Sequence, residues 1–343
     1  MNGPLTVADY EALAREKLDD NAWEYIRGGA GDETTMRENV EAFTRWKLRP
    51  RVLCDVGNVD TRTTVLGTEI ASPVLVAPVA LQKLAHVDGE AATARAAAAA
   101  RTIMCVSTSA TLRPAAVAAA AADAALWLQV YVFNDRGVTQ GLIDEACTNG
   151  YSALVLTVDT PLLGRREGAV RIGFHIPDDF EVAGDIFNDL SANVTWRDLD
   201  WLAGHGLPVV LKGVLTADDA RLAVEHGAAA VVVSNHGGRQ LDGVPASIDA
   251  LPEVVDAVAG RAEVLLDGGV RRGIDVVRSL ALGARAVLVG RAAVWGLAAA
   301  GEEGVRGVLD LLQKEVALGL ALLGCTSPAE VTRAHVALSP WKS

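Results

Sequence analysis

The stretch AVVVSNHGGRQLD, residues 230–242, changes character at its centre. An alanine and three valines, valine being a strand-forming type, are followed at once by polar, glycine and basic residues, as at the end of a buried strand. The same change recurs from residue 74 onward, and a helical pattern follows it. The apolar runs are VLVAPVA (74–80), TIMCVST (102–108), LWLQVYV (126–132), ALVLTVD (153–159), VVLKG (209–213), AVVVSNHG (230–237), VLLDGG (264–269) and AVLVGR (286–291).

Eight such runs alternating with helices predict a (β/α)8 barrel with a helical extension at its N-terminus. Strands that are apolar along their whole length are buried on both faces, as the strands of parallel sheets are. An open doubly wound sheet permits the same alternation, but the number of strands favours the barrel. We expect a single domain over 1–343, with N-terminal helices and a cap over 1–73, the barrel over 74–300 and C-terminal helices over 301–343.

Three further segments have a clear prediction. Residues 1–18 have the pattern of a capped amphipathic helix. Residues 115–133 are nearly as apolar as a membrane span, but Asp123 interrupts them, and alanines give way to strand formers in the second half. We therefore expect a helix that leads into a buried strand. Residues 165–207 form the longest interval between strands and have little helical period over 176–195, which is typical of an active-site loop.

The composition excludes several classes of protein. Half of the 343 residues are apolar, 22% are charged, and the net charge is -12, which argues against nucleic acid or an anionic membrane as partner. The scattered Cys54, Cys105, Cys147 and Cys325 show no spacing of metal ligands or of a disulfide framework, so we expect reduced thiols and no metal site. An anionic ligand would need a locally basic pocket.

Polar residues follow the predicted strands at their carboxyl ends. Barrel enzymes build their active sites at this end, so we expect these side chains to converge. They are Ser107, Gln129, Tyr131, Thr157, Asp159, Lys212, Ser234, His236, Arg239, Asp267, Gly290 and Arg291. A purely structural barrel has no use for so many buried polar and charged groups.

Two glycine-containing turns follow the last two strands. They are DGGVRRG, residues 267–273, and Gly290-Arg291. Barrels often bind a phosphate at these two loops, where backbone N–H groups point at the anion and glycine permits its close approach. Arg271 and Arg291 can add bidentate contacts. Either turn alone is a weak signal, but together they predict a phosphate site.

Several motifs resemble those of the FMN-dependent 2-hydroxy acid oxidases and dehydrogenases. They are SNHGGRQLD (234–242), LTVDTPLLGRR (156–166), VLKGV (210–214), LDGGVRRG (266–273) and LVGR (288–291). The resemblance extends from Tyr10 to about Cys325, and several motifs match almost letter for letter.

The resemblance implies a role for each matching residue. His236 would be the base that accepts a proton from the substrate, paired with Asp159, and Lys212 and Tyr131 would also take part in catalysis. Substrate contacts would come from Tyr25, Tyr131, Arg166, His236 and Arg239, with the two arginines holding the carboxylate. FMN would be held by Pro78, Val79, Ala80, Ser107, Gln129, Thr157, Lys212, Ser234, Asp267, Gly268, Gly269, Arg271, Gly290 and Arg291.

The implied activity is oxidation of an L-2-hydroxy acid to the 2-oxo acid, with O2 reoxidising the flavin and H2O2 as product. Two alternatives are the same chemistry with another electron acceptor and a non-catalytic flavin-binding relative. The second would be expected to have lost His236, Arg166 or Arg239, and all three are present. Another flavin or nucleotide barrel, such as inosine monophosphate dehydrogenase, would need a cysteine in a glycine-rich catalytic loop, which the chain does not show.

The sequence also departs from the family pattern. Ser109 stands where glycolate oxidases have a tryptophan, and the loop after the fourth strand is shorter than usual. Both differences predict a substrate bulkier than glycolate, such as a mandelate-like acid or a biosynthetic intermediate, free or attached to a carrier or peptide. The terminal Trp341-Lys342-Ser343 is no peroxisomal address, so we expect a cytoplasmic enzyme, and the resemblance implies a homotetramer.

Overall fold

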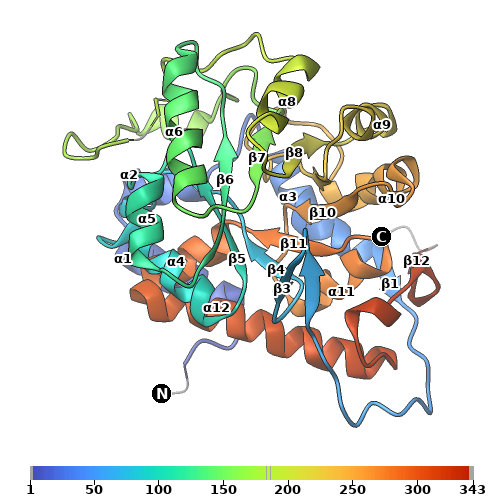
Figure 1. Ribbon diagram of the computed structural model, residues 1–343. Coiled ribbons are helices and arrows are strands. Elements are labelled where there is room, and N and C mark those ends of the chain that lie inside the picture. Colours follow the sequence, from blue (N-terminus) through green and yellow to red (C-terminus); the bar gives the residue numbers. More distant parts are fainter. Residues whose placement is uncertain (1–2, 183, 186, 340–343) are drawn as a thin grey trace.

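Eight parallel strands close into a barrel in the computed structural model, which describes residues 3–182, 184–185 and 187–339 (Figure 1). The strand order around the ring is β10-β11-β4-β5-β6-β7-β8-β9, so each strand lies beside its neighbour in the chain. The strands are β4 (Val74–Val76), β5 (Ile103–Ser107), β6 (Ala125–Val130), β7 (Leu154–Thr157), β8 (Val209–Val214), β9 (Ala230–Val233), β10 (Glu263–Asp267) and β11 (Ala286–Val289). The predicted (β/α)8 barrel is confirmed.

The parallel register brings the polar strand ends together. Ser107 on β5 lies beside Gln129 on β6, and Thr157 on β7 lies beside Lys212 on β8. The strands themselves are buried almost throughout, because helices cover the outside of the ring and apolar side chains fill it. Because apolar contacts cover the rest of each strand, the polar side chains gather at the carboxyl edge of the barrel.

Helices follow the strands around the barrel (Figure 1). They are α4 (Gly89–Ala99), α5 (Pro114–Ala120), α6 (Arg136–Thr148), α7 (Glu167–Arg171), α8 (Trp196–Ala203), α9 (Ala217–Glu225), α10 (Ser247–Val258), α11 (Gly273–Ala281) and α12 (Arg291–Leu323). The apolar stretch 115–133 is a helix, α5, followed by strand β6, as predicted. Among the described residues, no helix is both long enough and apolar enough to cross a membrane.

The described part of the N-terminal segment contains three helices, a 3-10 turn and three short strands. Helix α1 (Val7–Lys17) starts at a capping box in which Thr6 and Asp9 bond to each other's backbone, and α2 (Asp20–Arg27) and α3 (Thr34–Glu41) follow. A 3-10 turn, η1 (Ala42–Arg45), leads to β1 (Trp46–Leu48), and β2 (Thr63–Val65) pairs with β3 (Thr68–Ile70).

Helix α3 is attached to the loop that follows β9. Asn39 and Asn235 exchange side-chain hydrogen bonds at 2.8 and 2.9 Å, and the Asp242 carboxylate accepts the Thr35 N–H at 2.8 Å. The side chain of Asp242 thereby satisfies an N–H group at the start of α3 that no helical carbonyl can reach. This connection fixes the loop that carries His236 against the N-terminal segment.

The C-terminal segment, for which we expected helices, also contains a strand. After α12 come two 3-10 turns, η3 (Pro328–Glu330) and η4 (Arg333–His335), and then β12 (Val336–Leu338), which pairs antiparallel with β1. A strand of three residues is too short for an alternating pattern to show in the sequence. The terminal Trp341-Lys342-Ser343 lies outside the described residues.

Between β7 and β8 the described residues form α7 and α8 and are otherwise irregular, as expected for the described part of 176–195. Within it, Leu190 forms an isolated antiparallel bridge with Phe133, just after β6. The loop therefore lies against the carboxyl edge of the barrel.

Helix α12 bends back on itself at Ala300 and Gly301, whose backbone angles are not helical. The bend places Gly296 and Gly304 backbone against backbone, so a Cβ on Gly304 would overlap the carbonyl oxygen of Gly296. By contrast, a Cβ on Gly141 in α6 would have no atom within 4 Å.

We predict that Gly304→Ala lowers the free energy of unfolding by about 1–3 kcal/mol, because the added methyl group has no space. Gly141→Ala is the control and should leave stability unchanged or raise it by up to about 1 kcal/mol, since alanine favours the helix. Thermal melts of the two purified variants measure the effect. Equal melting temperatures would contradict the close packing at the bend.

Candidate active site

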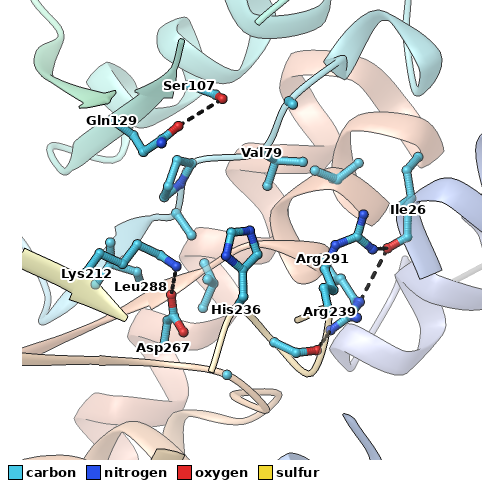
Figure 2. A pocket seen from close by; sticks show the side chains of 18 of the residues that line it. Ile26, Val79, Ser107, Gln129, Lys212, His236, Arg239, Asp267, Leu288 and Arg291 are labelled. Carbon is cyan, nitrogen blue, oxygen red and sulfur yellow. Dashed lines mark hydrogen bonds and ion pairs between the residues drawn. The ribbon is translucent and has the colours of Figure 1, made fainter. Parts of the chain in front are cut away.

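A cavity opens at the carboxyl ends of the barrel strands (Figure 2). The following residues predicted from the sequence line it: Tyr25, Pro78, Val79, Ala80, Ser107, Gln129, Tyr131, Thr157, Arg166, Lys212, His236, Arg239, Asp267, Gly268, Gly269, Arg271, Gly290 and Arg291. The other two predicted residues, Asp159 and Ser234, lie just behind the wall and bond to His236 and Lys212. Figure 2 shows His236 between the Lys212–Asp267 pair and the two arginines Arg239 and Arg291.

His236 and Asp159 form a hydrogen-bonded pair. His236 Nδ1 lies 2.9 Å from Asp159 Oδ1, and Thr160 Oγ1 donates to the same carboxylate oxygen at 2.9 Å. The other ring nitrogen, Nε2, lies 3.4 Å from the Tyr131 hydroxyl. Because a carboxylate can only accept, it holds the imidazole proton on Nδ1 and leaves the Nε2 lone pair on the side of Tyr131 and the cavity.

The backbone around this pair is specialised. His236 has a φ of 59°, a left-handed conformation that is uncommon for residues with a side chain, and Ser234 Oγ accepts its N–H at 3.0 Å. On β8, Gly213 has a φ of 113°, and a Cβ there would lie 2.7 Å from the Cβ of Asp159. Position 213 therefore needs glycine if Asp159 is to lie beside the histidine.

The surroundings set the protonation of these groups. Burial lowers the pKa of His236 below 6.5, although the Asp159 carboxylate acts in the opposite direction. Burial by itself would raise the pKa of Asp159, but His236 and Lys212 outweigh it and lower that pKa to about 2. Burial raises the pKa of Tyr131 to about 12, and Asp159 adds to the effect. At neutral pH the site thus contains a neutral imidazole, a carboxylate and a protonated phenol.

Lys212 is a buried, charged residue of the cavity wall, on the side of His236 away from Arg239 and Arg291 (Figure 2). Its ammonium group lies 3.2 Å from Asp267 Oδ2 and donates to Ser234 Oγ at 3.0 Å. Burial alone would lower the pKa of Lys212, but Asp267 and Asp159 raise it above its ordinary value. A fixed positive charge therefore faces the cavity at neutral pH.

Four guanidinium groups border the cavity: those of Arg166, Arg239, Arg271 and Arg291. Within the described part of the chain, none of them forms a salt bridge with a carboxylate. Arg239 and Arg291 instead donate to the backbone oxygen of Gly28, at 2.7 and 3.2 Å. Burial, together with neighbouring arginines, lowers the pKa of Arg239 and lowers that of Arg291 to about 9. Buried positive charge without a counterion favours the binding of anions.

Tyr25 brings an aromatic surface to the same region. Its ring stacks on Phe174 from the long loop, with centroids 4.6 Å apart and planes 15° apart. The guanidinium carbons of Arg239 and Arg166 lie 5.3 and 6.0 Å from the Tyr25 centroid. The arginines are thus held partly by a cation–π contact.

Several polar atoms of the cavity wall are buried but have no partner within the described residues. They are Gln129 Nε2, Thr157 Oγ1, Arg166 Nε and Asp267 Oδ1. Buried polar groups are normally hydrogen-bonded, so these atoms mark positions where a bound molecule offers donors and acceptors. The backbone of the turn at Gly268 and Gly269 lies close to Asn39. A Cβ on Gly269 would therefore overlap the Asn39 carbonyl.

Sequence reasoning missed the residues that support the site. Thr160 bonds to Asp159, and Asn39 holds Asn235 from a position 196 residues away in the chain. Gln240 donates to the backbone oxygens of Asp159 and Leu162, both at 3.0 Å. Thr160, Asn235 and Gln240 lie inside the quoted motifs and were within reach of the argument, whereas nothing near Asn39 signals its distant partner. The remaining lining residues are Ile26, Ala77, Gly237, Val270, Leu288, Val289 and Val294.

A sequence profile of the FMN-dependent dehydrogenases matches residues 14–338. The chain belongs to this family. It is 48% identical to glycolate oxidase 1 of Oryza sativa subsp. indica, over 97% of this chain and 96% of the relative. It is 47% identical to L-lactate oxidase of Nostoc sp., over 96% and 97% of the two chains. A solved structure of a mandelate oxidase variant with (S)-mandelic acid aligns with a TM-score of 0.94 and 41% identity, covering 98% of this chain and 100% of the other.

Membership of the family makes FMN the cofactor, and the cavity fits it. The unpartnered Gln129 Nε2, Thr157 Oγ1 and Asp267 Oδ1 offer donors and acceptors to a polar ring system and a hydroxylated chain. Arg271 and Arg291 form no salt bridge within the described residues and lie beside glycine turns, which suits a phosphate group.

We predict that Asp159→Asn lowers the pKa of His236 further, because the carboxylate is the main group that raises it. The histidine ring signals in NMR spectra recorded over a pH series measure this pKa, with His236→Ala supplying the assignment. Asp256→Asn is the control, since Asp256 is exposed and pairs with Arg333. An unchanged or higher His236 pKa in Asp159→Asn would rule out the pairing.

Proposed function

We propose that the protein oxidises an L-2-hydroxy acid to the 2-oxo acid and uses O2 as the electron acceptor, giving H2O2. The observation that carries the proposal is the neutral His236 imidazole, bonded to Asp159 at 2.9 Å and bordered by guanidiniums that form no salt bridge within the described residues, in an FMN-dependent family. The relatives named glycolate oxidase and L-lactate oxidase support the same substrate class.

Arg166 and Arg239 bind the substrate carboxylate in this proposal. Both guanidiniums line the cavity beside Tyr25, and Arg166 Nε has no partner among the described residues. A planar guanidinium matches a carboxylate with two parallel hydrogen bonds, which a lysine cannot provide. Burial and repulsion from Arg166 and Arg291 lower the pKa of Arg239, and a bound carboxylate would relieve this repulsion.

His236 is the base. Its Nε2 accepts a proton from the substrate, and the Asp159 carboxylate on Nδ1 stabilises the imidazolium that forms. Tyr131, 3.4 Å from Nε2 and protonated at neutral pH, can donate a hydrogen bond to a substrate oxygen next to the base. FMN, when bound, accepts the two electrons that the substrate loses and passes them to the acceptor. Lys212 supplies a fixed positive charge that would favour negative charge on the flavin ring.

The proposed substrate is larger than glycolate and mandelate-like. Tyr25 lines the cavity, and Phe174 stacks on the Tyr25 ring from the long loop and supports this aromatic surface, against which an aryl group could pack. Ser109 is buried and is not among the residues that line the cavity, so the proposal rests on the aromatic surface and not on this position. Solved mandelate oxidase structures align closely with this chain, which supports a mandelate-like substrate.

We predict that the purified protein is yellow and loses its colour when a 2-hydroxy acid is added without oxygen. His236→Ala should keep FMN bound but slow the bleaching by about 10²–10⁴-fold, because the general base is missing. Stopped-flow absorbance measures both, and His226→Ala, outside the cavity, is the control.

The outcomes separate the alternatives. Recovery of colour and release of H2O2 on admission of air support an oxidase, whereas recovery only with a dye or quinone indicates a dehydrogenase. Yellow protein that no 2-hydroxy acid bleaches would be a non-catalytic flavin-binding relative. Bleaching of His236→Ala at the rate of the unmodified enzyme would refute the role of the histidine.

For the substrate, we expect kcat/KM for mandelate to exceed that for glycolate by about tenfold or more, as an apolar group gains contact area in the pocket. Phe174→Ala should reduce the value for mandelate and leave that for glycolate nearly unchanged. Phe180→Ala, in the same loop, is the control. Equal turnover of glycolate and mandelate would argue against a bulky substrate.

A further inference from the structure

Arg271 lies in an unusual environment for a cation. Its guanidinium carbon lies 4.6 Å from the centroid of the Trp295 ring, and its Nη1 donates to the backbone oxygen of Val270 at 2.9 Å. No carboxylate in the described residues forms a salt bridge with it, yet it lines the cavity beside the Gly268–Gly269 turn. The face of an aromatic ring and one backbone oxygen therefore hold its side chain, whereas Glu11 and Asp275 raise its pKa only from beyond salt-bridge distance, against the larger effect of burial.

Trp295 lies in the first turns of α12, which begins directly after β11. Its side chain is 1% exposed, and its Nε1–H has no hydrogen-bond partner in the described part of the chain. An unpartnered buried N–H is unfavourable, so a phenylalanine or leucine would fill this space at lower cost. Packing alone does not account for a tryptophan here, but a large electron-rich face under Arg271 does, because indole gives the strongest cation–π contact.

Arg271 and Arg291 line the same cavity and are held by different groups. Arg291 donates to the backbone oxygens of Gly237 and Gly28, at 2.9 and 3.2 Å, while Arg271 rests on Trp295. Backbone oxygens and an aromatic ring thus hold the two guanidiniums, and neither is neutralised by a carboxylate in a salt bridge within the described residues. Each keeps N–H groups for a doubly charged anion at the glycine turns.

We propose that Trp295 is a positioning residue for the cofactor: by stacking on Arg271, it orients the guanidinium toward the FMN phosphate. This inference rests on the proposed role of Arg271 in holding that phosphate. It assigns a function to a tryptophan that does not itself line the cavity.

Riboflavin provides the test, because it has the ring and ribityl chain of FMN but no phosphate. The full-length chain is stripped of flavin and titrated with FMN and with riboflavin, and quenching of flavin fluorescence gives each affinity. Arg271→Leu should weaken FMN binding about 100-fold and leave riboflavin binding nearly unchanged, since a charge-assisted hydrogen-bond pair is lost only with FMN. Trp295→Leu should weaken FMN binding about tenfold, again without an effect on riboflavin.

Two further variants make the result specific. Trp295→Phe keeps an aromatic face and should bind FMN more tightly than Trp295→Leu, and it covers the case in which Trp295→Leu does not fold. The double variant Arg271→Leu/Trp295→Leu should bind FMN no more weakly than Arg271→Leu alone, because the tryptophan acts only through the arginine. Trp201→Leu removes a similar contact, with Arg136 at 5.4 Å from the ring, and should bind FMN normally.

Three results would overturn the proposal: Trp295→Leu with unchanged FMN affinity, an equal loss of riboflavin and FMN binding in Trp295→Leu or Trp295→Phe, or additive losses in the double variant. Unchanged FMN binding in Arg271→Leu would also overturn it, by removing the arginine from the phosphate site. These titrations do not use substrate. A failure to oxidise 2-hydroxy acids would therefore reject the proposed function, but the titrations would still test whether Trp295 positions Arg271.

Discussion

Closing eight parallel strands into a ring forces all their carboxyl ends to the same edge, and the chemistry of this protein depends on that constraint. No motif in the chain contains a complete site. Asp159 follows β7, Lys212 lies on β8 and His236 follows β9, and only the register of these neighbouring strands brings the three side chains together. Once they meet in a space from which water is largely excluded, each sets the protonation of the others, so that a carboxylate and an ammonium coexist with an uncharged imidazole.

Positive charge is the second property that the barrel mouth concentrates. The protein as a whole is acidic, with a net charge of -12, yet the cavity is bordered by four arginines without carboxylate partners in the described residues. The structure supports these guanidiniums with backbone carbonyls and aromatic faces, which stabilise a cation without neutralising it. This arrangement differs from a structural ion-pair network, in which each charge is already balanced. It leaves the binding energy available for an anionic cofactor and an anionic substrate.

The sequence was sufficient for the barrel and for the inner surface of the site, because both repeat a local pattern: an apolar strand followed by polar residues. Asn39, Gly213 and Trp295 were out of reach for a different reason. Their importance comes from contacts across the fold: with Asn235, with the Cβ of Asp159 and with the guanidinium of Arg271. A lone asparagine, glycine or tryptophan has many possible roles, and only three-dimensional neighbours select one. The strand β12 was missed because three residues show no period.

The bonds between α3 and the loop after β9 have a consequence for biosynthesis. Residues 35 and 39 leave the ribosome long before residues 235 and 242, to which they bind. During most of translation the amino-terminal helices thus have no surface on which to dock, and loops of this length close slowly. The contacts that fix the loop around His236 can form only after residues 235–242 have left the ribosome. A ribosome-bound fragment would therefore contain much of the barrel and still lack the catalytic geometry.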